Sequence, residues 1–166
     1  MGHMRGAWAV LGLALAASGC EPGEIVPAID SASGIELGTG DQFEPLDDDA
    51  PLDVVLGIQG GYHVVGNALI SGYIPQPVLG GGGGEVRFEL IAYDGIPLNI
   101  DSGAIQNGLE EHPDGTYTCS PGHHVLIGVQ PSELDGTPAE FRVLMPGGEG
   151  EMMTDSRRVV LRFAHP

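Results

Sequence analysis

The chain has 166 residues, of which 23 are Asp or Glu and only 6 are basic, all of them Arg, so its formal net charge is −17. Such an acidic chain cannot neutralise a run of phosphates, which excludes nucleic acid as a partner, and anionic lipid headgroups repel it. Because 42% of the residues are hydrophobic and 17% are charged, we expect one folded domain, and the 28 Gly and 13 Pro indicate many turns rather than long helices.

The first twenty residues have the features of an export signal. Arg5 precedes an apolar run over residues 7–17, which is too short to cross a hydrocarbon layer of about 30 Å. Three small residues then lead directly to Cys20. An ordinary secretory signal with an incidental cysteine is the alternative interpretation.

This segment resembles the lipobox of bacterial lipoproteins, although Ala17 stands where that motif usually has leucine. The resemblance implies that residues 1–19 are a cleaved signal peptide and that Cys20 carries lipid. Residues 20–34 would then form the lipidated tether, and residues 35–166 the folded domain. Glu21 follows the cysteine, where Asp retains some lipoproteins in the inner membrane, so the resemblance favours the outer membrane.

Beyond the signal, short apolar runs alternate with turn sequences, and no window repeats every 3.6 residues. Apolar and polar residues alternate most clearly in 86–93 and 158–163, as in strands with one buried face. We expect strands at residues 35–37, 42–46, 52–57, 62–70, 85–93, 98–100, 117–119, 124–129, 139–145 and 158–163.

A series of about seven to nine short strands without helices predicts an all-β fold, an antiparallel immunoglobulin-like β-sandwich. A jelly roll is the alternative, since strand number does not separate the two. Residues 34–70, which include Gly34-Ile-Glu-Leu-Gly-Thr-Gly and Gly57-Ile-Gln-Gly-Gly-Tyr-His, also resemble a domain of uncharacterised envelope lipoproteins. That resemblance implies location and fold but no activity.

Histidine and cysteine side chains form one candidate metal site. Imidazole and thiolate suit zinc or copper, and the candidate ligands are His63, His112, Cys119, His123 and His124. Against this site, neighbouring residues of a strand face opposite sides of a sheet. In the alternative arrangement His124 points into the sheet, His123 points to solvent and Cys119 is a small core residue.

An acidic segment between two predicted strands forms a second candidate site. Carboxylates at a loop tip can converge on calcium, and the candidate ligands are Asp47, Asp48, Asp49 and Asp53. Their spacing is not that of an EF-hand loop. The alternative is a solvated run of charge.

Motifs for catalysis are absent from the sequence. There is no Gly-x-Ser-x-Gly elbow, and the glycines at 80–84 lack the lysine and helix of a phosphate-binding loop. We therefore expect no enzyme activity and no cofactor. The expected function is that of a binding or structural module of the cell envelope, attached to a membrane by its N-terminal lipid and contacting an envelope protein or a glycan. The alternative is a periplasmic lipoprotein that binds copper or zinc.

Overall fold

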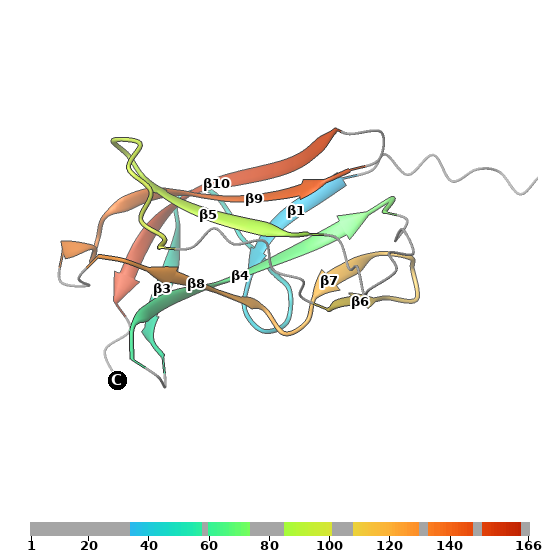
Figure 1. The fold of residues 1–166 in the computed structure, drawn as a ribbon, viewed down its shortest axis with the longest axis horizontal. Coiled ribbons are helices and arrows are strands. Elements are labelled where there is room, and N and C mark those ends of the chain that lie inside the picture. Colours follow the sequence, from blue (N-terminus) through green and yellow to red (C-terminus); the bar gives the residue numbers. More distant parts are fainter. Residues whose placement is uncertain are drawn as a thin grey trace, which may run out of the picture. The chain divides into compact units, whose positions relative to one another are not determined.

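Ten strands form the fold in the computed structural model, so the all-β class is confirmed (Figure 1). The structure describes residues 34–57, 60–73, 85–100, 108–129, 133–147 and 151–163. Within these ranges no helix has the length and apolar character needed to cross a membrane. The strands are β1 (Gly34–Thr39), β2 (Glu44–Pro45), β3 (Ala50–Leu56), β4 (Tyr62–Ser71), β5 (Arg87–Ala92), β6 (Leu109–Glu111), β7 (Tyr117–Cys119), β8 (His123–Ile127), β9 (Pro138–Pro146) and β10 (Met152–Phe163).

The predicted strands recur with three differences. Residues 98–100 make only an isolated bridge, which joins Asn99 to Ile127. Strand β6 was not predicted, because Leu-Glu-Glu has no alternation. Strand β10 begins at Met152, six residues before the predicted start. Its first half is too polar and too exposed to show a hydrophobic pattern in the sequence.

The sheet is mixed rather than wholly antiparallel. Strand β10 runs parallel to β3, from the pair Val159–Ala50 to the pair Phe163–Val54, and the other strand pairings among the described residues are antiparallel. The wholly antiparallel arrangement predicted from the sequence is therefore wrong at this pair. A parallel pair needs a long crossover connection, and β4 to β9 all lie between β3 and β10 in the chain.

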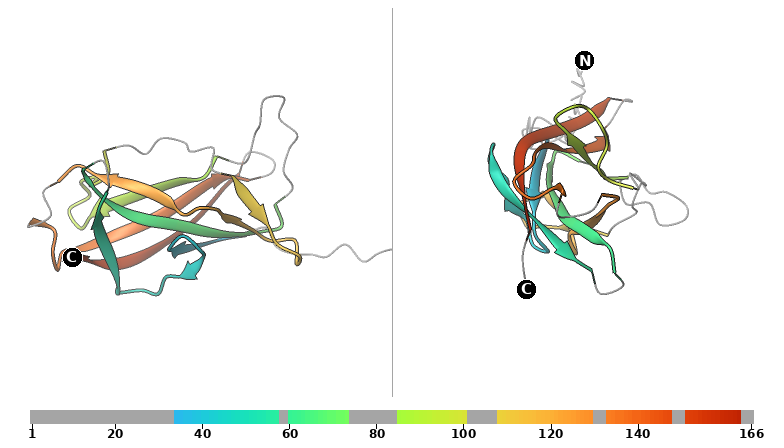
Figure 2. Two further views of the ribbon diagram at one scale, coloured as in Figure 1. Left: turned by 90° about the horizontal axis from the view of Figure 1, so that it is seen from below. Right: turned by 90° about the vertical axis from the view of Figure 1, so that its left-hand side faces the viewer.

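Strand β3 joins two halves of the sheet. Its residues 50–54 pair with β10, whereas Val55 and Leu56 pair with β4. The β4 half consists of β1, β2, β4, β6, β7 and β8, with β4 at its centre. The β10 half consists of β5, β9 and β10. The end-on view in Figure 2 shows the red β10 and the green β4 on opposite sides of the described region.

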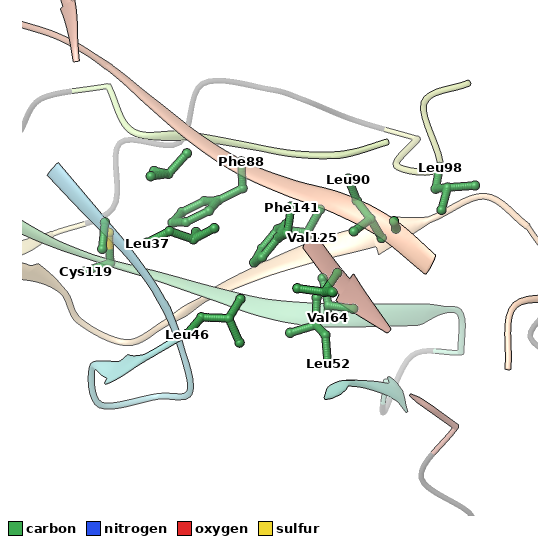
Figure 3. Packing of buried hydrophobic residues seen from close by; sticks show 14 of the residues in the cluster. Leu37, Leu46, Leu52, Val64, Phe88, Leu90, Leu98, Cys119, Val125 and Phe141 are labelled. Carbon is green, nitrogen blue, oxygen red and sulfur yellow. The ribbon is translucent and has the colours of Figure 1, made fainter. Parts of the chain in front are cut away.

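Apolar side chains of the two halves pack against each other to form the core. Phe88 of β5 and Phe141 of β9 have ring centroids 5.9 Å apart, and Val64 of β4 lies opposite them (Figure 3). A Cβ atom added at Gly66 of β4 would lie 2.6 Å from the Phe88 ring. Glycine at this position therefore lets an aromatic ring from the β10 half sit directly on the β4 backbone.

The turn between β1 and β2 folds over the outer face of β4. The Asn67 amide nitrogen donates to the Gly40 carbonyl oxygen at 3.0 Å, and the Asn67 side-chain oxygen accepts from the backbone of Ala68. A Cβ atom at Gly122 would overlap the same Gly40 carbonyl oxygen. These contacts hold the β1–β2 turn in place over the outer face of β4.

Candidate functional site

A pocket of about 530 Å³ lies between the β1–β2 turn and the β6–β7 hairpin, above the outer face of β4. We call it the hairpin pocket. Its volume falls within the range of sites for small molecules, about 300–1,000 Å³. It is lined by Asp41, Gln42, Phe43, Leu69, Glu110, His112, Asp114, Thr116, Thr118, Cys119 and Ser120.

Strand register explains why these side chains meet. Glu110 of β6 is opposite Thr118 of β7, which in turn is opposite Leu69 of β4. Residues in one row across a sheet project to the same face. The pocket floor is thus built from three neighbouring strands.

Hydrogen bonds hold the β6–β7 hairpin in shape. The His112 Nε2 and Thr118 Oγ1 atoms are 2.8 Å apart, and Thr118 is only 8% exposed. The Asp114 carboxylate accepts from the Thr116 hydroxyl at 2.7 Å and from the Thr116 backbone at 3.0 Å. The Thr116 side-chain hydrogen bond is the main reason why the pKa of Asp114 lies below its ordinary value.

The charge of the hairpin pocket is negative. Asp41, Glu110 and Asp114 supply three carboxylates, and no arginine lines it. Among the described residues, every arginine lies in the β10 half and pairs with a carboxylate. A ligand in the hairpin pocket therefore meets three carboxylates and no arginine, so a positively charged group fits best.

A second pocket, of about 480 Å³, lies over the outer face of the β10 half. We call it the platform pocket. Unlike the hairpin pocket, it contains both arginine and carboxylate side chains. It is lined by Asp48, Ile91, Ala92, Tyr93, Gly95, Ala139, Glu140, Ser156, Arg157 and Arg158.

The five predicted ligands of zinc or copper are not brought to one point. His63 and His124 stack with ring centroids 4.2 Å apart on the outer face of the β4 half, whereas the His123 ring lies over Phe88 on the inner face. The alternation of a strand separates His123 from His124 as expected, but their directions are reversed: His123 faces the core and His124 faces solvent.

The other two predicted ligands, His112 and Cys119, both line the hairpin pocket, but neither is arranged as a metal ligand there. His112 is bonded to Thr118 in the hairpin pocket. Cys119 is free and 1% exposed, and burial raises its thiol pKa to about 11, which disfavours the thiolate that a metal needs. Within the described ranges, no group of three or more His, Cys, Asp or Glu side chains is arranged to hold a metal ion.

The predicted calcium ligands are used mainly for ion pairing with β10. Asp53 accepts from Arg162 Nε at 2.7 Å and from Nη2 at 3.1 Å, and Asp49 pairs with Arg158 at 3.0 Å. The Asp48 carboxylate accepts from the Arg158 backbone, and Asp47 is exposed. The acidic segment thus forms exposed ion pairs beside the parallel β3–β10 pair, and its carboxylates form no group arranged to hold a metal ion. The hydrogen bond from Arg162 to Asp53 also raises the pKa of Arg162.

No known protein family, curated protein or solved structure matches this chain. Cys20, the predicted lipidation site, lies outside the described residues.

The sequence does not predict the hairpin pocket, because Leu109-Glu110-Glu111 lacks the alternation that indicates a strand. One signal could have indicated it. Asp114-Gly115 is a hairpin turn sequence, and threonines follow it at alternate positions, 116 and 118.

We expect His63 to make the domain less stable in mild acid. Burial, and then the charge of the stacked His124, lowers the pKa of His63 below its ordinary 6.5 in the folded protein. The contribution of neutral His63 is complete above about pH 6.5 and is lost as the pH falls towards the lower folded pKa, since the unfolded chain binds the proton more readily. Urea unfolding at about pH 7.5 and about pH 5.5 should show a smaller loss for His63→Phe than for the wild type.

The control for this experiment is His112→Asn, which changes a histidine outside the stacked pair. It should keep the wild-type loss of stability between the two pH values. An equal loss in His63→Phe and the wild type would contradict the expectation.

Proposed function

We propose that the protein is a lipid-anchored binding module of the bacterial cell envelope without catalytic activity. In this proposal Cys20 carries the lipid, the outer membrane holds it, and the hairpin pocket binds the ligand. The small residues before Cys20 support the anchor, and the net charge of −17 would keep the domain away from anionic headgroups.

We also propose that the two halves of the sheet form an immunoglobulin-like sandwich, antiparallel except at β3 and β10. The packing of Phe88 from the β10 half onto Gly66 of the β4 half supports this arrangement. Sandwich domains commonly bind through loops at one end. The walls of the hairpin pocket, a turn and a hairpin, would be such binding elements.

The observation that carries the binding function is the set of carboxylates in the hairpin pocket. Three of them line this pocket together with Phe43. Carboxylates form their strongest hydrogen bonds with ammonium and guanidinium groups, and an aromatic ring attracts a cation to its face. The ligand that fits is a primary amine, either free or on a lysine side chain of an envelope protein.

Isothermal titration of the full chain in micelles with spermidine, in roughly 0.15 M salt, tests this proposal, because such salt screens attraction to the general charge of the protein. We expect Glu110→Gln to weaken binding about tenfold, since a charge-assisted hydrogen bond becomes a neutral one. Glu133→Gln removes the same charge at an exposed position outside both pockets and should bind like the wild type.

Equal affinity of the two variants would mean that spermidine responds only to net charge. The hairpin pocket would then not be the binding site. The absence of binding to the wild type would also refute the proposal.

A further inference from the structure

Tyr93 is presented to solvent on a fixed hairpin at one end of the platform pocket. Its side chain is 74% exposed. The backbone nitrogens of Ala92 and Gly95 donate within the turn, at 2.8 Å to Ile96 and Ala92 respectively, and Asp94 accepts from the Ile96 nitrogen at 3.2 Å. The hydrogen-bonded turn therefore holds the Tyr93 ring in solvent. A ligand can bind to this ring at little cost in side-chain conformational entropy.

A row of three side chains crosses the sheet within the platform pocket. Ile91 of β5 is opposite Glu140 of β9, which is opposite Arg158 of β10, so the three form one row on the outer face. Neighbouring strands are about 4.8 Å apart, so the side chains of Glu140 and Arg158 leave the sheet close to each other.

Ion pairs hold these polar groups in position. Arg142 donates to Glu140 at 2.9 Å, and Arg158 donates to Asp49 at 3.0 Å. Both Glu140 and Arg158 remain partly exposed, with 40% and 58% of their side-chain surface accessible. They offer a fixed acceptor and a fixed donor next to the aromatic ring, which is the preorganisation that binding sites need.

We propose that the platform pocket binds a neutral carbohydrate. A sugar ring has an apolar face of C–H groups that can stack on Tyr93. Its hydroxyls both donate and accept hydrogen bonds, and so match Glu140 and Arg158 together. The balance of acidic and basic groups in the pocket favours a ligand without net charge.

A peptide strand fits this surface less well. Extended peptides usually bind by pairing with a free sheet edge. Strand β9 lies between β5 and β10, so its backbone groups are already paired within the sheet. Strand β5 is at the edge, but next to the pocket its Ala92 nitrogen donates to the Ile96 oxygen and its Leu90 oxygen accepts from the Leu98 nitrogen, both at 2.8 Å. A ligand must therefore recognise side chains on the face of the sheet.

The test is an array of neutral oligosaccharides of hexoses and N-acetylhexosamines, probed with the full chain in a detergent that contains no sugar. We expect the wild type to bind at least one of them. Tyr93→Ala should weaken that binding about tenfold, whereas Tyr93→Phe keeps the stacking ring and should retain most of it. Leu126→Ala, on the outer face of the β4 half, is the control and should bind like the wild type.

Three results would overturn this proposal. They are no binding to any oligosaccharide, unchanged binding by Tyr93→Ala, and a loss of binding in Glu110→Gln. The last would move the carbohydrate to the hairpin pocket. Because the amine and the carbohydrate are assigned to separate pockets, either proposal can fail while the other stands.

Discussion

Phe141→Ala is expected to lower the free energy of unfolding by about 3–5 kcal/mol, the usual cost of removing a buried aromatic ring. Phe141 is fully buried in the centre of β9, and its ring stacks against Phe88 (Figure 3). Removing it deletes apolar contact and leaves a cavity where the two halves of the sheet meet. Urea unfolding measures the change, and the slope of the transition should stay constant if only stability is altered.

Tyr93→Ala is the matched control, because it removes an aromatic ring that is exposed. Its effect on stability should stay within about 0.5 kcal/mol. If Phe141→Ala does not fold, Phe141→Leu keeps most of the apolar volume and should show a smaller loss. Equal stability of Phe141→Leu, Tyr93→Ala and the wild type would contradict the central place of Phe141 in the core.

The strands that were predicted well are those with one buried face. In β9 every second residue from Ala139 to Met145 is buried, and the apolar alternation of the sequence follows the same period. In β10 only Val159 and Leu161 are buried, so the pattern was visible only over the second half of the strand. Alternation of apolar and polar residues in the sequence indicates a strand with one buried face. An exposed strand segment has no such alternation.

The parallel pairing of β3 with β10 could not be read from local patterns. It joins residues that are far apart in the sequence, such as Asp53 and Arg162, which are 109 residues apart and form an exposed ion pair. The acidic segment suggested a cation site because its own sequence contains no counter-charge. The counter-charge comes from the last strand of the described chain, which only the fold brings near.

The alternation of side chains along a strand predicts only part of the outcome for the zinc or copper site. It correctly separates His123 from His124, since neighbouring strand residues face opposite sides. It cannot say which of them faces the core. That choice follows from Val125 and Ile127, which are buried and share a face with His123.

The two cysteines provide a comparison that tests lipidation. Cys119 is enclosed by the core, and burial raises its pKa to about 11, so it is protected from modification. Cys20 follows three small residues at the end of an apolar run. Only Cys20 therefore follows a recognisable processing sequence, which makes the pair a natural test of the anchor.

Cys20→Ala is expected to abolish incorporation of labelled fatty acid when the full chain is expressed in a bacterium that makes lipoproteins. It should also move the protein from the membrane to the soluble fraction, because each buried methylene of an acyl chain contributes about 0.8 kcal/mol and two or more chains give stable attachment. Cys119→Ala is the control and should keep both the label and the membrane fraction. A Cys20→Ala protein that still carries label and still sediments with membranes would refute the proposal that Cys20 is the anchor.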